Sequence, residues 1–126
     1  MAERRYTFTK QQRIRSRIDF SAVFEKGIKQ TRGPLAAVAV PTSHSKPRLG
    51  LSVSRRVGTA PRRNRIKRLI REAFRLMQHD FPRSYDLVII VRPHDPLILA
   101  EYQRLLSGLM VKLHNAWQVR EARDAT

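Results

Sequence analysis

The feature that most constrains the fold of this chain is an amphipathic segment that runs from residue 62 to residue 77. Its apolar side chains recur at intervals of three and four residues, at Ile66, Leu69, Ile70, Ala73, Phe74 and Met77. At about 100° per residue these positions share one side of an α-helix. The segment therefore predicts a helix over residues 62–77 whose apolar side packs against the rest of a folded domain.

The other side of this predicted helix is almost entirely basic. Residues 62–75 contain seven Lys and Arg residues but a single acid, Glu72. A surface of one charge lacks the opposite-charge pairs that stabilise exposed helices, and arginines in the first turn oppose the helix dipole. We therefore predict an anion-binding surface, formed by Arg62, Arg63, Asn64, Arg65, Lys67, Arg68, Arg71 and Arg75. The alternative, a polar face that contacts only solvent, stays open at this point.

The charge of the whole chain is distributed just as unevenly. The formal net charge is +16, yet residues 76–126 are neutral, with six basic and six acidic residues. Arg outnumbers Lys by 20 to 6, and a guanidinium group binds phosphate through two hydrogen bonds at once. This asymmetry predicts a polyanionic partner for the first three fifths of the chain, either nucleic acid or an anionic membrane surface. Nucleic acid is favoured, because predicted strands are available to cover the apolar side of the helix.

Length and composition exclude several other classes of protein. The 126 residues suit a single domain, residues 1–126, and the absence of cysteine excludes a disulfide scaffold, a Cys-ligated zinc site and a thiol nucleophile. No apolar run reaches the roughly 18 residues of a membrane span, and residues 1–10 lack the apolar core of a secretory signal. We therefore expect a cytoplasmic protein without a membrane partner.

Hydrophobic periodicity and turn residues predict the order of the elements. Helical spacing predicts two further helices, at residues 19–26 and 97–118, with Asp19 as the N-cap of the first. Apolar runs predict three strands, at residues 35–40, 48–54 and 86–92. We expect a basic, flexible arm at residues 1–17 and a frayed tail at residues 119–126. The order helix, strand, strand, helix, strand, helix predicts an α/β (α+β) two-layer sandwich, with a hairpin between the first two strands.

The second predicted strand alternates between large apolar residues and small or polar residues. Leu49, Leu51 and Val53 lie on one face, and the other face consists of Arg48, Gly50, Ser52 and Ser54. A nucleotide backbone could approach such a face closely. Two aromatic residues of the first helix, Phe20 and Phe24, could stack on bases or pack in the core. Arg55 and Arg56 follow the strand, either as phosphate contacts or as a charged turn.

The sequence offers no residues arranged for catalysis by the protein itself. A metal-dependent nuclease needs clustered acids or histidines, but the acids here are scattered and His44, His79 and His114 are isolated. His94 and Asp95 lie between two prolines and are most simply a turn. We therefore predict no catalytic residue, no metal site and no small-molecule substrate.

Residues 63–75, Arg-Asn-Arg-Ile-Lys-Arg-Leu-Ile-Arg-Glu-Ala-Phe-Arg, resemble the Arg-Asn-Arg helix of the protein subunit of bacterial ribonuclease P. Residues 48–58 resemble the second strand of that family and the turn after it, and residues 18–27 resemble its first helix. The resemblance covers about residues 13–118. A structural RNA-binding protein, such as a ribosomal component, would share the charge and the fold class, but the helix signature favours the ribonuclease P family.

The resemblance implies a fold and a function. The fold would be a small mixed sheet with helices, like the second domain of ribosomal protein S5, with a left-handed β-α-β crossover. The protein would bind ribonuclease P RNA and precursor tRNA and assist removal of the 5′ leader. The RNA would perform the chemistry with Mg²⁺, and the protein alone would bind no cofactor. The basic helix would lie on the catalytic RNA, and a cleft would hold the single-stranded leader. The cleft residues would be Phe20, Phe24, Arg48, Gly50, Ser52, Ser54, Arg55 and Arg56.

Overall fold

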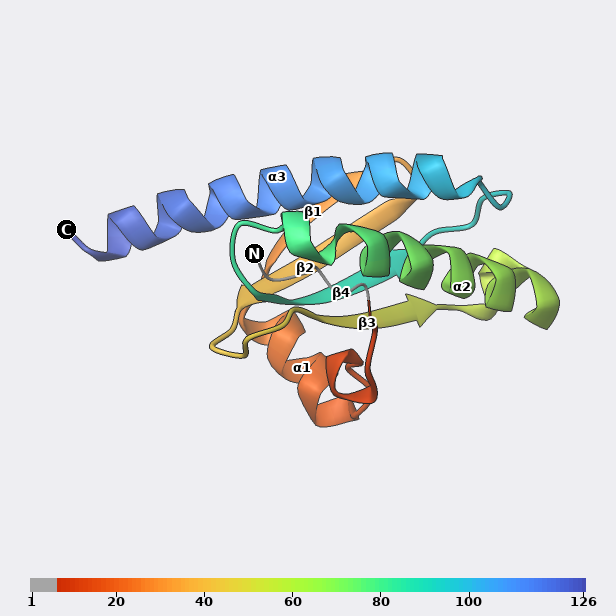
Figure 1. Ribbon diagram of the computed structural model, residues 1–126, viewed down its shortest axis with the longest axis horizontal. Helices are drawn as coiled ribbons and strands as arrows, with labels where there is room; N and C mark the ends of the chain where they lie inside the picture. The colour runs from red at the N-terminus through yellow and green to blue at the C-terminus, as the bar shows by residue number, and fades with distance from the viewer. Residues whose placement is uncertain (1–6) are drawn as a thin grey trace.

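A four-stranded sheet separates two layers of helices in the computed structural model, which describes residues 7–126 (Figure 1). The helices are α1 (Arg17–Lys26), α2 (Ala60–Met77) and α3 (Leu99–Asp124). The strands are β1 (Ile28–Arg32), β2 (Leu35–Pro41), β3 (Arg48–Val53) and β4 (Tyr85–Val91). Three short 3-10 helices complete the order: η1 (Lys10–Gln12), η2 (Arg55–Val57) and η3 (Gln78–Asp80). Helices α2 and α3 cover one face of the sheet, and α1 packs on the other.

The strand order is β1-β2-β4-β3, so β4 lies between the two strands that we expected to form a hairpin. That prediction is wrong: β2 pairs with β4 antiparallel, and β3 pairs with β4 parallel. The hairpin is formed instead by β1 and β2, joined at Gly33, whose φ of 56° suits glycine. Sequence analysis missed β1 because Ile-Lys-Gln-Thr-Arg shows neither an apolar run nor clear alternation.

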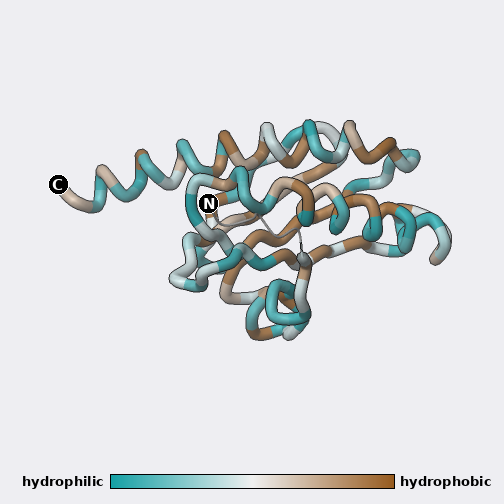
Figure 2. Tube along the Cα trace, in the orientation of Figure 1, coloured by the Kyte–Doolittle hydropathy of each residue, from teal (hydrophilic) through white to brown (hydrophobic). Residues whose placement is uncertain are grey.

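The parallel unit β3-α2-β4 holds the basic helix against the sheet. The apolar stripe predicted for this helix is confirmed: Ile66, Ile70, Ala73 and Phe74 are fully buried, and Met77 is 9% exposed. These side chains pack with α3 and with one face of the sheet. Along the traces of α2 and α3, hydrophobic positions alternate with hydrophilic ones (Figure 2). A smaller apolar cluster beneath α1 contains Ile14, Val23, Val38 and Val88. The mixed α+β fold class is therefore confirmed, although α1 adds a third layer to the two-layer sandwich that we predicted. The hand of the crossover stays a prediction.

The N-terminal segment packs on the sheet, where we had predicted a flexible arm over residues 1–17; its first six residues lie outside the described part. The Ile14 amide donates to the Leu49 carbonyl at 2.9 Å, so the segment covers the outer edge of β3. Gln12 is buried, and its side chain donates to Gln78 at 2.8 Å and to the Pro47 carbonyl at 3.1 Å. These bonds satisfy the buried amide and hold the segment in place.

Two other predicted boundaries need correction. Helix α3 continues to Asp124, so residues 119–124 are not a frayed tail. An ion pair between Arg83 and Glu121 at 2.7 Å and the Arg120 guanidinium over the Trp117 ring stabilise this last part. Helix α1 begins at Arg17, and its N-cap is Ser16, whose hydroxyl accepts from the Asp19 amide at 3.1 Å.

Candidate nucleic-acid interface

The start of α2 is defined by the turn that leaves β3. Gly58 has a φ of 148°, a conformation that side chains disfavour, and a Cβ there would lie 2.5 Å from Cδ of Arg62. The Thr59 hydroxyl then caps the helix by accepting from the Arg62 amide at 3.4 Å. Because the apolar stripe of α2 is buried, its basic residues necessarily lie on the outer side of the helix.

Most cations of this outer side have no acidic partner in the part of the chain that the structure describes. Arg62 pairs with Asp95 at 3.2 Å, and Arg75 donates to both oxygens of Glu72. Within residues 7–126, no carboxylate pairs with the remaining five, Arg63, Arg65, Lys67, Arg68 and Arg71. Asn64 lies exposed among them. The surface predicted from the sequence is therefore assembled on one rigid helix and largely unneutralised.

The N-terminal segment forms a second wall beside this surface. A hollow of about 460 Å³, which we call the α2 hollow, is lined by Phe8, Arg13, Asn64, Lys67, Arg68, Arg71, Glu72 and Arg75. The Phe8 ring packs 5.5 Å from the Phe74 ring, and the Arg13 guanidinium lies 5.3 Å from the Phe8 centroid. Sequence analysis placed Arg13 in the basic arm and assigned it to neither the helix surface nor the cleft. The only sequence signal that this segment packs on the fold is the pair of apolar residues, Phe8 and Ile14, that flank a polar stretch.

Three arginines meet where the N-terminal segment passes α2. Burial lowers the pKa of Arg71, and the positive charges of Arg13 and Arg15 lower it further. The Nε atoms of Arg13 and Arg63 are buried without a hydrogen-bond acceptor among the described residues. A bound phosphate would offset the charge repulsion and supply acceptors, so this region is suited to a polyanion.

A second hollow lies on the α1 side of the same arginines. This α1 hollow, of about 220 Å³, is lined by Arg13, Ile14, Arg15, Phe20, Leu49, Leu51 and Arg71. Phe20 is partly buried against the cluster beneath α1, whereas Phe24 is 46% exposed. Their ring centroids are 6.3 Å apart. One aromatic ring therefore lies beside a group of guanidinium groups, and a second ring extends toward solvent.

The sheet face that we expected to be open is partly filled by the protein itself. Gly50 is buried, and a Cβ there would lie 2.9 Å from Cζ of Phe20 and 3.1 Å from Cβ of Ile14. Its small size therefore admits the chain's own side chains, not a nucleotide backbone. Ser52 is partly exposed, and the remaining predicted cleft residues, Ser54, Arg55 and Arg56, lie exposed at the exit from β3.

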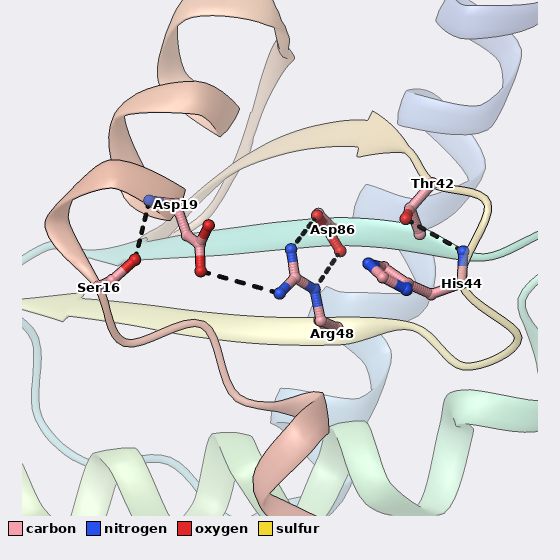
Figure 3. Close-up of polar contacts among 6 residues, drawn as sticks. All are labelled: Ser16, Asp19, Thr42, His44, Arg48 and Asp86. Carbon is pink, nitrogen blue, oxygen red and sulfur yellow. Dashed lines mark hydrogen bonds and ion pairs between the residues drawn. The ribbon is translucent and has the colours of Figure 1, made fainter.

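Arg48, also predicted for the cleft, is held by carboxylates. Its Nε and Nη2 donate to Oδ1 and Oδ2 of Asp86 at 2.8 and 2.6 Å, and Nη1 lies 3.9 Å from Oδ2 of Asp19 (Figure 3). The hydrogen bond to Asp86 raises the pKa of Arg48 against the opposing effect of burial. Arg48 thus lies beside α1 as expected, but its charge is already neutralised.

Two of the four histidines, His94 and His114, make structural contacts through their rings. His94 bonds to the Arg92 carbonyl and the Tyr102 hydroxyl, both at 2.7 Å, and His114 bonds to the Tyr85 hydroxyl at 2.8 Å. In the described chain, no three His, Asp or Glu side chains gather closely enough to hold a metal ion. No helix of residues 7–126 is long and apolar enough to cross a membrane.

Comparison with known proteins identifies the family. The ribonuclease P family model matches residues 8–114. The RNase P protein of Staphylococcus aureus has 29% sequence identity and a TM-score of 0.69, over 79% of this chain and 92% of that one. The RNase P protein of Thermotoga maritima also has 29% identity, with a TM-score of 0.70 over 78% of this chain and 94% of that one. The chain therefore belongs to the ribonuclease P protein family, whose members are the protein subunit of the endoribonuclease that matures the 5′ ends of tRNA.

Proposed function

We propose that the outer side of α2 binds the RNA subunit of ribonuclease P. The observation that carries this proposal is the set of five cations without an acidic partner in the described chain, displayed on a helix whose other side is buried. Arginine forks suit phosphate oxygens, and Asn64 can both donate and accept hydrogen bonds. The α2 hollow would receive phosphates of the RNA between Arg13 and the helix.

We further propose that the α1 hollow binds the single-stranded 5′ leader of precursor tRNA. Unpaired bases stack on aromatic rings, and guanidinium groups bind the backbone that links them. Phe20 and the arginines at positions 13, 15 and 71 provide both kinds of contact within one hollow. Phe24, Arg55 and Arg56 are exposed nearby and would extend the path of the leader.

In this proposal the protein binds and orients RNA, and the RNA subunit cleaves the phosphodiester bond. The described residues gather no set of metal ligands, so we assign none of them to magnesium and place the ions on the RNA. The expected setting is the cytoplasm, where precursor tRNA is processed in a bacterial cell. Binding both RNAs at adjacent hollows would place the leader junction close to the catalytic RNA.

Reconstitution tests the proposed function. The protein is added to a bacterial ribonuclease P RNA at a magnesium concentration too low for the RNA to work alone, and cleavage of precursor tRNA is followed. We expect the protein to restore cleavage and the holoenzyme to bind precursor tRNA more tightly than mature tRNA. Failure to restore cleavage at near-physiological salt would refute RNA-subunit binding, and equal affinity for the two tRNAs would refute leader binding.

A further inference from the structure

Arg48 lies at the start of β3, on the α1 side of the sheet, and contacts acidic residues of two other elements. Asp86 on β4 accepts two hydrogen bonds from its guanidinium, and Asp19 on α1 approaches the third nitrogen at 3.9 Å. Figure 3 shows the guanidinium between the two carboxylates. These three residues, which we call the Arg48 network, connect two strands of the sheet to the first turn of α1.

The geometry of the network requires a guanidinium. The side chains of Arg48 and Asp86 are 22% and 14% exposed, so solvent screens their interaction only partly. Two parallel hydrogen bonds to one carboxylate define the orientation of the arginine as well as its distance. Lysine could keep the charge but could not form this fork.

Helix α1 depends on such a contact because its apolar packing is slight. Val23 is its only fully buried side chain, and Phe20 is partly buried. The C-terminal end is held where Gly27 approaches Val38 so closely that a Cβ on residue 27 would clash with Cγ1 of Val38. At the N-terminal end, the polar contacts are the Ser16 cap and the Arg48 network. Asp19 directly precedes Phe20, so the network holds the turn of α1 from which the Phe20 ring reaches the α1 hollow.

We propose that Arg48 is a positioning residue for the 5′ leader. It acts through Asp86 and Asp19 to place α1, and therefore Phe20 and Phe24, at the distance from the sheet at which the rings stack on leader bases. The inference rests on the proposed binding of the leader at the α1 hollow. Arg48 contributes no phosphate contact of its own, because its charge is satisfied by Asp86.

Two substitutions that change the net charge in opposite directions test this inference. The holoenzyme is reconstituted with ribonuclease P RNA, and the leader preference is measured as the ratio of the Kd for mature tRNA to that for precursor tRNA. Arg48→Gln removes a positive charge, whereas Asp86→Asn removes a negative one. A positioning role lowers the ratio in both variants by about fivefold or more, the change that corresponds to losing about 1 kcal/mol of base stacking. A direct contact of Arg48 with phosphate predicts opposite signs, because Asp86→Asn would release the guanidinium to bind the leader.

Matched variants control for charge and for folding. Glu25→Gln makes the same charge change as Asp86→Asn on an exposed residue of α1 that has no ion pair within residues 7–126, and we expect the ratio to stay unchanged. Arg48→Lys keeps the charge without the fork and should give an intermediate ratio. Asp19→Asn alters a carboxylate that is 45% exposed and should lower the ratio slightly. It also tests the inference if Asp86→Asn does not fold.

The outcomes separate this inference from the proposed function. If the wild-type holoenzyme shows no leader preference, leader binding is refuted and the role of Arg48 is refuted with it. If the wild type prefers precursor tRNA but folded Arg48→Gln and Asp86→Asn variants keep that preference, or change it in opposite directions, only the positioning role is refuted. Equal losses of affinity for both tRNAs would likewise refute positioning, because they indicate a contact that does not involve the leader.

Discussion

Gly50 is the residue at which α1, β3 and the N-terminal segment come closest together. A methyl group there would meet the Phe20 ring at 2.9 Å, Cβ of Ile14 at 3.1 Å and the Ile14 carbonyl at 3.3 Å. Two of these three atoms belong to backbone or to the first side-chain carbon, so they cannot swing away. We expect Gly50→Ala to lower the free energy of unfolding by about 1–3 kcal/mol, the usual cost of overpacking, as measured by urea denaturation.

Gly108→Ala is the matched substitution elsewhere in the fold. The atoms that a Cβ would meet there are the end of the Arg32 side chain, at 2.5 to 2.7 Å, and Arg32 is exposed and flexible. Alanine also favours the helix over glycine by about 1 kcal/mol. This variant should be at least as stable as the wild type. Equal stability of Gly50→Ala and the wild type would show that the N-terminal segment does not rest on β3 in solution.

The same position shows what residue patterns can and cannot predict. Alternation along residues 48–54 correctly placed Gly50 opposite Leu49 and Leu51, but it carries no information about which distant segment covers that face. Phe20 and Ile14 arrive from parts of the chain that are remote in sequence. Arg48 was predicted on the same face as Gly50, and it lies there. Its neutralisation by Asp86 was not predicted, because it depends on a strand pairing that no local pattern predicts.

Phe20 both packs on the cluster beneath α1 and lines the α1 hollow, so a test of its function must preserve its packing. Phe20→Leu keeps an apolar side chain but removes the aromatic face. We expect the affinity of the holoenzyme for precursor tRNA to fall by about 1–3 kcal/mol, the usual contribution of one stacked base, with mature tRNA unaffected. Parallel titrations of the two tRNAs measure this, and equal losses for both would assign the ring to the core alone.

At the scale of whole elements, α2 was predictable because one segment contains both of its determinants. The 3.6-residue period defines the buried stripe, and the excess of arginine defines the outer side, without reference to any partner element. Strand β1 was not predictable in this way. Its polar residues become a strand through backbone pairing with β2, and the order of strands in the sheet depends on how β4 inserts between β2 and β3.

Reversing two charges on α2 tests whether the outer side of this helix binds ribonuclease P RNA. Arg65 and Arg68 are exposed and have no acidic partner in the described chain, so Arg65→Glu/Arg68→Glu should leave the free energy of unfolding within about 0.5 kcal/mol of the wild type. Affinity for ribonuclease P RNA should fall. The slope of log K against log salt concentration should decrease in magnitude by about 2, one for each lost phosphate contact.

The control is a double reversal on α3, Arg104→Glu/Lys112→Glu. Both residues are exposed and unpaired within residues 7–126, and the net charge changes by the same amount. This variant should keep most of its RNA affinity and nearly all of its salt dependence. If the two double variants lost affinity equally, RNA binding would depend on the total charge of the protein, not on the surface of α2.

In the whole molecule the charge is concentrated on some elements: α2 and the N-terminal segment are strongly basic, whereas α3, which packs beside α2 on the same face of the sheet, belongs to the neutral part of the chain. The net charge of +16 comes entirely from residues 1–75, which include the N-terminal segment and nearly all of α2. Like charges held this close oppose the compact state. The fold therefore carries an electrostatic cost that any ligand able to neutralise these basic elements will reduce, and stability should depend on polyanions more than on salt in general.

Inorganic pyrophosphate, a minimal stand-in for the RNA backbone, can show this dependence in thermal unfolding. At about ten times its Kd, a single bound anion adds about 1.4 kcal/mol of stability, whereas sodium chloride at equal ionic strength only screens charges.

Arg71→Gln makes the prediction about pyrophosphate specific to one site. It removes a partly buried cation whose pKa is lowered by burial and by Arg13 and Arg15, so it should raise the Tm in the absence of pyrophosphate. It should also reduce the gain in Tm on adding pyrophosphate, because the same guanidinium lines both hollows. If the Arg71→Gln variant had a lower Tm without pyrophosphate and the same gain in Tm on adding it, the anion would not bind at Arg13, Arg15 and Arg71.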